Sequence, residues 1–431
     1  MISLLKAEKL TATFRAFQNP NYRLFFGGQS ISQIGTWMQR TGVSWVIYTM
    51  THSPFMLGLT VFASQFPSFI FSLPGGVASD RYNRYRVLLL TQIASMIQAL
   101  LLAILTLTNH YSVTGILLLS MLLGIINAFD VPARQPLIHE MVTDRADLPN
   151  ALALNSSMVN LARLIGPALS GIVLVKWGAG TCFLLNALTF IAVIISLLLM
   201  KLPPYIPPPV KNNIRSELNE GFRYLKNTPS ISITLLLLGL ISLLVLPYNT
   251  VLPVFAKVIF KGDAATFGYI NSFIGIGAVA GSVFLATLHP KTDLKTILFV
   301  STIIFGIFLI LFSHMSNFPL AMVFASATGF GMMNQTTICI TIVQVESDKE
   351  MRGRVMSYVA MAYFGMLPLG SLLVGSVSQR IGAPDTILAQ GIIALIIAAL
   401  FYKFLRKKKL EPAVSRKEEE EKAENLVMEK I

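Results

Sequence analysis

Long apolar segments separated by short polar turns make up almost the whole chain of 431 residues. About 20 consecutive apolar residues are enough for a helix to cross the hydrocarbon core of a membrane. We therefore expect an all-α membrane protein. The pattern predicts twelve membrane-spanning helices, near residues 23–50, 54–79, 87–108, 112–138, 148–175, 179–200, 230–256, 264–288, 294–313, 318–345, 353–379 and 385–405.

The twelve predicted spans form two groups of six, separated by a proline-rich segment at 202–209, where a helix cannot continue. After it, Ile214, Leu218, Phe222 and Leu225 recur at helical spacing, which predicts an amphipathic helix on the membrane surface. A linker without regular structure is the alternative. The predicted divisions are an N-terminal segment (1–22), a six-helix half (23–201), a linker (202–229), a second six-helix half (230–405) and a charged tail (406–431).

The two halves share a weak internal repeat. The sequence Gly-Ile-Ile-Asn at 124–127 in the fourth span matches Gly-Met-Met-Asn at 331–334 in the tenth. Two parallel six-helix repeats are an architecture of secondary transporters, which bind substrate between the halves. The repeat therefore predicts two pseudo-symmetric halves with a substrate site between them.

The distribution of charge predicts the orientation in the membrane. Only 13% of residues are charged, and the net charge is +13. Most Lys and Arg residues fall on the side that holds both termini, and only Lys176, Lys257, Lys261 and Arg380 fall on the other side. Short basic loops face the cytoplasm, so both termini are expected there, with some attraction to anionic lipid headgroups. No basic patch with interleaved aromatic residues predicts binding of nucleic acid.

A basic hairpin joins the second and third predicted spans. Gly75 and Gly76 are expected to let helices approach closely, and Asp80, Arg81 and Arg84 follow at the membrane edge. We expect this hairpin to form part of a cytoplasmic gate. In that gate, Asp80 would dock on the cytoplasmic end of the eleventh span.

The first predicted span carries a polar stripe along one helix face. Gln33, Trp37 and Arg40 lie on it at helical spacing. A charged side chain within a membrane is costly unless it faces protein or water, so this face predicts a wall of a transport cavity with hydrogen-bonding, stacking and cationic groups. Alternatively, Arg40 extends to the outer membrane interface.

The fourth predicted span contains Asn127, Asp130 and Arg134, three and four residues apart. Asp130 is the only acidic residue well inside a predicted span. Burial favours the protonated form of a carboxyl group, and a nearby cation favours the ionised form. Asp130 is therefore a candidate proton carrier; alternatively, it pairs with Arg134 or Arg81 in an ionic latch of the inner gate.

The fifth predicted span places Arg163 near mid-membrane, followed by Gly166 and Pro167. Small residues permit close helix packing, and proline loosens backbone hydrogen bonding, so both are expected to serve gating. We expect Asp130 to be the partner of Arg163. Because Arg40 is a second intramembrane cation, the surplus of positive charge predicts an anionic or strongly polar substrate.

In the second half, Pro247 and Pro253 interrupt the seventh predicted span beside Tyr248 and Asn249. Broken helices of this kind lie beside substrate sites in transporters. Tyr248 and Asn249 are therefore substrate-binding candidates. Asn334 and Gln335 in the tenth span are two more, and hydrogen bonding between helices is the alternative for each of them.

The sequence contains no catalytic motif. His139-Glu140 lacks the second histidine of a zinc-binding helix, and no glycine-rich loop ends in Lys-Ser or Lys-Thr. We expect no enzymatic activity, no metal site and no cofactor. Transport would be secondary, with a proton gradient as its driving force.

The hairpin at 75–86 resembles the signature loop between the second and third helices of the major facilitator superfamily. Further motifs resemble the drug:proton antiporter branch, which includes exporters of the siderophore enterobactin: NYRLF (21–25), GQ (28–29), GTWMQ (35–39), THSP (51–54) and DVPARQ (130–135).

This resemblance implies a monomeric exporter in the bacterial inner membrane that expels siderophores or amphipathic drugs in exchange for protons. The resemblance also favours an ionic latch, rather than proton carriage, as the role of Asp130. Residues 162–171 resemble the Gly-Pro-rich motif of exporters in this superfamily. The alternative is an importer or uniporter of a small nutrient or lysolipid.

Overall fold

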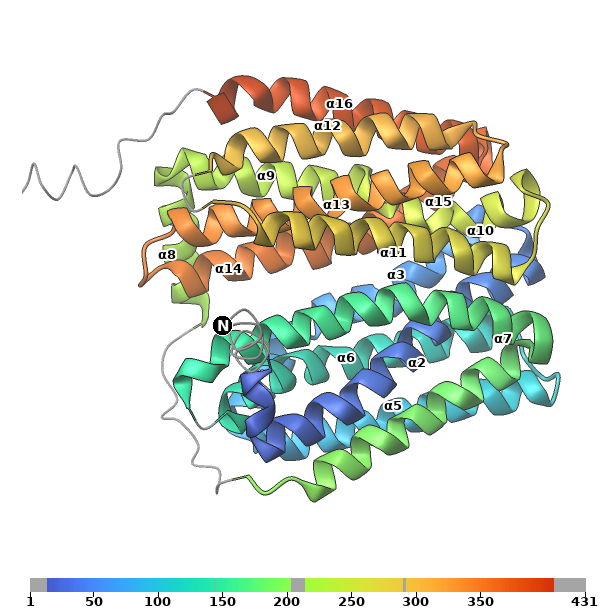
Figure 1. Cartoon of the computed structure of the whole chain (residues 1–431), viewed down its shortest axis with the longest axis horizontal. Coiled ribbons are helices and arrows are strands. Elements are labelled where there is room, and N and C mark those ends of the chain that lie inside the picture. The colour runs from blue at the N-terminus through green and yellow to red at the C-terminus, as the bar shows by residue number, and fades with distance from the viewer. Residues whose placement is uncertain (1–13, 143, 203–213, 290–291, 407–431) are drawn as a thin grey trace, which may run out of the picture.

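The computed structural model describes residues 14–142, 144–202, 214–289 and 292–406, and these ranges are helical without a strand (Figure 1). A short turn of helix, η1, precedes the bundle, and another, η2, follows α6. The helices of the N-terminal half are η1 (Arg15–Gln18), α2 (Pro20–Thr51), α3 (Pro54–Ile70), α4 (Ser72–Arg81), α5 (Arg84–Leu107), α6 (Val113–Met141), η2 (Arg145–Asp147) and α7 (Leu148–Leu199).

Three spans of this half differ from straight, separate helices. The second predicted span is bent by 48° between α3 and α4. The fifth and sixth spans are joined without an intervening loop in α7, where Gly178 has a φ of 79°. This positive φ is accessible to glycine at little cost, so one residue reverses the direction of the chain.

The C-terminal half begins with the amphipathic helix of the linker and then a broken span. Its elements are α8 (Ile214–Asn227), α9 (Pro229–Leu244), η3 (Leu246–Val251), α10 (Leu252–Val254), η4 (Phe255–Ile259), α11 (Ala264–Ala286), α12 (Leu294–Ser313), α13 (Phe318–Glu346), α14 (Arg352–Ala360), η5 (Met361–Gly365), α15 (Met366–Ile381) and α16 (Ala383–Arg406). The predicted interruption of the seventh span is confirmed. Gln390 of α16 donates hydrogen bonds to the carbonyls of Leu244 and Val245 at the break.

Within the described ranges, eight helices are long and apolar enough to cross a membrane, and the bent α3–α4 pair is a ninth candidate. Because α7 folds back at Gly178, it supplies two crossings. The more polar α2 and α13 have 32 and 29 residues, long enough to span a bilayer. Together these crossings agree with the predicted twelve.

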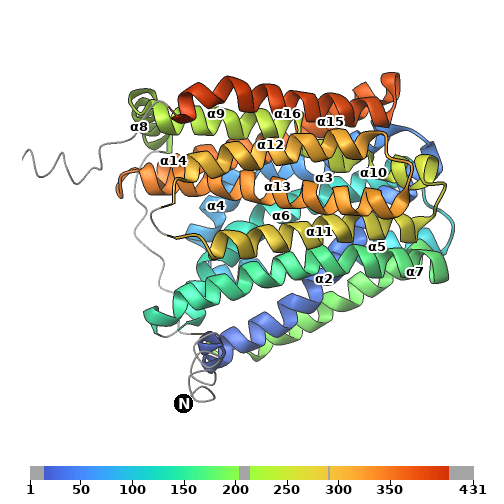
Figure 2. The same ribbon diagram turned by 45° about the horizontal axis from the view of Figure 1, so that its top comes forward.

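The N-terminal and C-terminal halves lie side by side along the bundle (Figures 1 and 2). We call the end where α8 lies the linker end; α2 begins and α16 ends there (Figure 1). The opposite end, where α7 reverses at Gly178, is the far end. The helices of the two halves therefore run between the same two ends.

The packing of glycines reveals the repeat between the halves. Gly124 of α6 packs against Ser64 and Pro67 of α3, the second span of its half. In the C-terminal half, Gly329 makes the corresponding contact with Ile274 of α11, whereas Gly331 packs against α12. The structural counterpart of Gly124 is thus Gly329, two residues before the glycine that the sequence match selects.

The predicted amphipathic helix is present as α8, and it packs on the C-terminal half. Glu220 pairs with Arg354 of α14 at 2.7 Å, and the backbone amide of Asp348 donates to the Tyr224 hydroxyl at 3.1 Å. On the predicted apolar face, Leu225 is buried but Phe222 is exposed. The side chains of Ile214 and Leu218, residues 203–213 and the tail from 407 lie outside the described part of the chain.

Candidate functional site

Trp37 of α2 is the centre of a cationic cluster between α2 and α7. The guanidinium carbons of Arg40 and Arg163 each lie over its indole ring, 5.2 Å from the ring centroid. Because both lie over one ring, the two guanidinium carbons are at most about 10 Å apart. Arg40 and Arg163 therefore share one aromatic ring, and Arg40 is exposed. The place of Arg40 in a transport cavity stays a prediction.

The contact between α2 and α7 depends on a glycine. A Cβ atom on Gly166 would lie 2.5 Å from the Cβ of Trp37 and 3.0 Å from the carbonyl oxygen of Ile34. One turn further along, the Ser170 hydroxyl donates to the carbonyl of Met38 at 3.0 Å. Gly166 thus allows α7 to approach α2 and brings Arg163 within reach of Trp37.

A buried chain of three amide side chains lies behind this cluster, and the sequence analysis did not identify it. Asn186 of α7 donates to Gln39 at 2.7 Å, and Gln39 donates to Gln98 of α5 at 3.0 Å. Gln98 in turn donates to the carbonyl of Leu119 in α6 at 3.1 Å. The chain restrains the rotation of α2 next to Arg40. Its only signal in the sequence is the presence of amides within apolar spans.

The Asp130 carboxylate is 2% exposed and is held within the N-terminal half. It pairs with Arg134, one turn along α6. It also accepts hydrogen bonds from Thr91 at 3.0 Å and from Gln92 at 2.6 Å, both on α5. This carboxylate therefore joins α6 to α5, and Arg81 takes no part in the contact.

The expected pairing of Asp130 with Arg163 is wrong. In the described part of the chain, every hydrogen-bond donor recorded on Asp130 belongs to α5 or to Arg134, and Arg163 has no acidic partner. The Nε of Arg163 is buried without a hydrogen bond. The pair was expected because an arginine within the membrane needs an acidic partner, but Asp130 pairs with Arg134, the alternative named above, which lies one turn away on the same helix.

The hairpin between α4 and α5 is held to α6. A Cβ on Gly75 would lie 2.0 Å from the Ala128 carbonyl oxygen, whereas a Cβ on Gly76 would meet no atom within 4 Å. The close approach expected of both glycines thus depends on Gly75 alone. Arg84 donates to Glu140 at 2.9 Å.

The remaining charges of the hairpin do not define a gate in this structure. Arg81 is exposed. The side chain of Asp80 lies outside the described residues, so its expected docking on the eleventh span stays a prediction.

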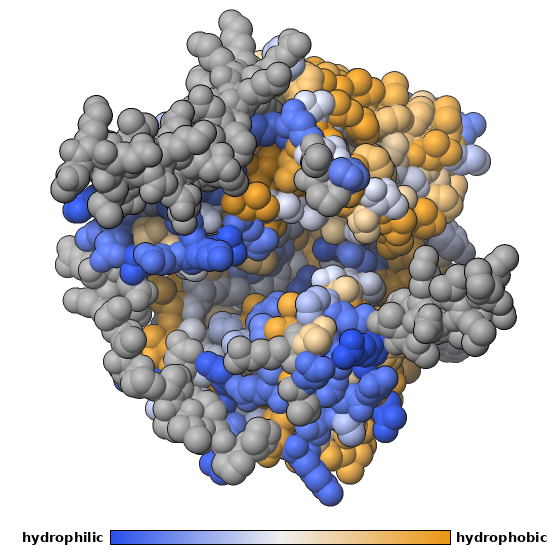
Figure 3. Space-filling view, turned by 60° about the vertical axis from the view of Figure 1, so that its left-hand side comes forward, coloured by the Kyte–Doolittle hydropathy of each residue, from blue (hydrophilic) through white to orange (hydrophobic). Residues whose placement is uncertain are grey.

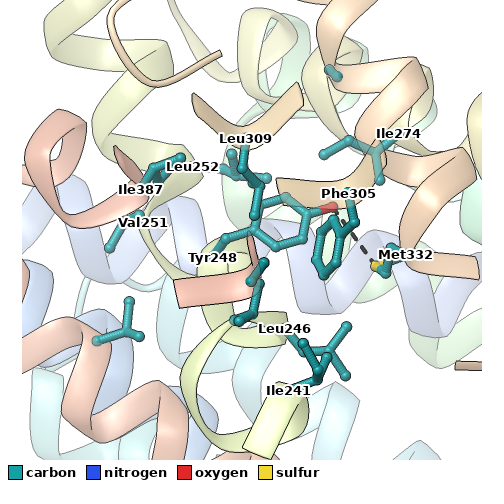
Figure 4. Packing of buried hydrophobic residues seen from close by; sticks show 14 of the residues in the cluster. Ile241, Leu246, Tyr248, Val251, Leu252, Ile274, Phe305, Leu309, Met332 and Ile387 are labelled. Carbon is teal, nitrogen blue, oxygen red and sulfur yellow. Dashed lines mark hydrogen bonds between the residues drawn. The ribbon is translucent and has the colours of Figure 1, made fainter. Parts of the chain in front are cut away.

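At the break in the seventh span, Tyr248 and Asn249 point to different environments. Tyr248 is fully buried among apolar side chains, 5.7 Å from the Phe305 ring centroid, and its hydroxyl contacts the Met332 sulfur at 3.7 Å (Figure 4). Asn249 is exposed. Of these two candidates, Tyr248 packs the core of the C-terminal half, and only Asn249 is free to meet a ligand.

Asn334 and Gln335 of α13 are fully buried. The Gln335 amide donates to the Cys339 sulfur at 3.5 Å, and neither polar atom of the Asn334 side chain has a hydrogen-bond partner. Both residues therefore lie in the helix interior of the C-terminal half. In the other half, Asn127 is only half-buried.

The two halves are joined along the far part of their interface. A Cβ on Gly58 of α3 would lie 2.4 Å from the Ser371 carbonyl oxygen of α15, and one on Gly268 of α11 would lie 2.5 Å from that of Pro167 in α7. At the linker end, the molecular surface is hollowed between two polar lobes (Figure 3). Pro167 thus lies at the closed part of the interface.

Among the described residues, no group of His, Cys, Asp and Glu side chains has the arrangement of a metal site.

A family model described as transmembrane secretion effector matches residues 11–430. The chain belongs to this family of the major facilitator superfamily. The staphyloferrin A transporter of Staphylococcus aureus is 28% identical over 397 residues, which cover 90% of this chain and 97% of the relative. The enterobactin exporter EntS of Escherichia coli is 26% identical over 383 residues, which cover 89% of this chain and 91% of that relative.

Solved structures share the fold. A bacterial homologue of the lysosomal transporter Spinster, solved in an inward-facing and unoccupied conformation, has a TM-score of 0.69 at 15% identity and covers 90% of this chain. A D-xylose–proton symporter has a TM-score of 0.71 at 12% identity and covers 92%. Family and fold together identify a multi-pass membrane protein of the transporter class, and the expected relation to siderophore transporters is confirmed.

Proposed function

We propose that this family member is a secondary active transporter of the bacterial inner membrane that exports a siderophore, with proton influx as its driving force. Both termini and the linker end would face the cytoplasm. The hollow at the linker end would then be the entrance from the cytoplasm.

The observation that carries this proposal is the uneven interface between the halves. Close glycine contacts join α3 to α15 and α7 to α11 toward the far end, while the linker end is hollowed (Figure 3). A transporter that exposes its site to one side at a time requires two bodies that separate at one end while they pack at the other. The Trp37 cluster lies at the level where these contacts begin.

The two relatives support a siderophore as substrate, and the name of one specifies export. The test of direction uses a strain that lacks its own siderophore exporters and produces a catecholate siderophore. Expression of the protein should lower intracellular siderophore and raise the amount in the medium. If intracellular siderophore instead rises when it is supplied outside, the protein is an importer, and the proposal of export is wrong.

Proton coupling is tested separately, in vesicles with an imposed pH gradient. Asp130 is the proposed site of coupling because it is a buried acid within a membrane-length helix, α6. Asp147, which is also buried, lies in the short turn η2 and pairs with Arg15. Asp130→Asn should retain substrate exchange and lose transport that depends on the gradient. Glu140→Gln, at the exposed end of α6, is the matched control and should keep coupling. Gradient-driven transport that is unchanged in Asp130→Asn would exclude this carboxylate as the carrier.

A further inference from the structure

Two intramembrane arginines of the N-terminal half have no counter-charge. Among the described residues, Arg134 is neutralised by Asp130, whereas no carboxylate pairs with Arg40 or Arg163. Neither side chain is fully buried: Arg40 is exposed and Arg163 is half-buried. The Trp37 ring is the contact that the two guanidiniums share, and one cation–π contact contributes only about 0.5–2 kcal/mol. Both charges therefore stay available to an anionic ligand.

From this geometry, we infer that Trp37, Arg40 and Arg163 form a binding site for a planar organic dianion whose two acidic oxygen groups each meet one guanidinium. The inference rests on the proposed transport function and names the chemical class of its substrate. A siderophore can present such acidic oxygens on its chelating groups, whereas a cationic drug cannot.

The dimensions of the cluster fit one small ligand. Each guanidinium carbon is 5.2 Å from the same ring centroid, so the two carbons are at most about 10 Å apart. A guanidinium presents a planar fork of donors that suits two oxygens of one acidic group. The buried, unbonded Nε of Arg163 is a donor still available to such a group.

The site is also open to a ligand. Arg40 is exposed although it lies within the bundle, and Trp37 is half-buried. Because Gly166 has no side chain, α7 packs closely against Trp37, and no side chain at position 166 covers the indole ring. Arg134 adds no net charge, because Asp130 pairs with it. The local balance of three arginines and one aspartate is therefore two positive charges, which a dianion matches.

The test uses purified full-length protein in lipid nanodiscs, with phthalate as the dianion and phthalamide as its neutral analogue. The chain has three tryptophans. Trp45→Phe and Trp177→Phe leave Trp37 as the only tryptophan reporter. Phthalate should change the Trp37 fluorescence in a saturable manner, and phthalamide should not. Each of Arg40→Gln and Arg163→Gln should weaken phthalate binding by about tenfold or more.

Lys257→Gln is the matched control, because Lys257 lies over a different ring, that of Trp45, at 6.0 Å. It should leave phthalate binding unchanged. Arg163→Lys retains the charge and should bind phthalate better than Arg163→Gln. It also keeps the test valid if the glutamine variant does not fold, as judged by size-exclusion chromatography.

Two results would overturn the inference: equal affinity for phthalate and phthalamide, or phthalate binding that is the same in the arginine variants and in Lys257→Gln. The cellular export assay, run on the same variants, separates this failure from that of the proposed function. Siderophore export without dianion binding would contradict the proposed site and support the proposed function. Dianion binding without siderophore export would contradict the proposed function and support the proposed site.

Discussion

In the N-terminal half, α2 and α7 bring Trp37, Arg40 and Arg163 together, with both guanidiniums over the Trp37 ring. In the C-terminal half, the broken seventh span, which occupies the position of α2 in the repeat, buries Tyr248 among apolar side chains instead (Figure 4). Asn334 and Gln335 of α13 are likewise buried. In the proposed site, the N-terminal half therefore supplies the charges that meet the ligand, while the C-terminal half supplies a packed apolar body at the corresponding position.

The largest effect is expected from removing a charge of the Trp37 cluster, compared with removing a buried amide in the C-terminal half. Arg163→Gln should reduce siderophore efflux by about tenfold or more, since it removes one of two cations that face the ligand. Asn334→Leu removes an amide that is buried without partners, so efflux should stay within about twofold and thermal stability should not fall. Both are measured as efflux per transporter in cells. Equal losses in the two variants would contradict the division between the halves.

The next effect concerns the fit of α7 against α2. Gly166→Ala should destabilise the protein by about 1–3 kcal/mol, because the new Cβ overlaps Trp37. It should also shift the fluorescence of a variant in which Trp37 is the only tryptophan. Gly239→Ala in α9 is the control, since its Cβ would have no neighbour closer than 3.8 Å. This control should be neutral or stabilising by up to about 1 kcal/mol.

A comparable loss of stability should follow from breaking the amide chain. Gln39→Leu leaves the amides of Asn186 and Gln98 without their partner, at a cost of about 1–3 kcal/mol. Replacing all three amides by leucine should restore part of this stability, because no unpaired group remains. Thermal unfolding in detergent measures both variants. A triple variant less stable than Gln39→Leu would show that packing, rather than hydrogen bonding, dominates here.

The smallest effect compares two aromatic residues. Tyr248→Phe removes only a weak hydroxyl contact with the Met332 sulfur, so stability should change by less than about 1 kcal/mol and efflux should be retained. Trp37→Phe keeps a ring but weakens its attraction for cations, and it should lower efflux severalfold without a large change in stability. An efflux defect in Tyr248→Phe as large as that in Trp37→Phe would place Tyr248 in the binding site.

The sequence by itself determined the fold class. Apolar segments of membrane length, the proline break at 247–253 and the helical periodicity of the linker act locally, so each can be interpreted from a short window. The polar stripe through Trp37 and Arg40 was identified for the same reason, because residues three and four apart share one face of a helix.

Only the tertiary structure decided which of these groups meet. The hydrogen bonds from α5 to Asp130, the burial of Tyr248 and Asn334, and the chain from Asn186 through Gln39 to Gln98 depend on how helices far apart in the sequence rotate and approach. That approach is controlled by glycine contacts such as Gly166 with Trp37, in which the deciding feature is the absence of a side chain. The sequence pattern indicates which face of a helix is polar. The side chains of the adjacent helix decide whether those polar groups are paired, buried or accessible to a ligand.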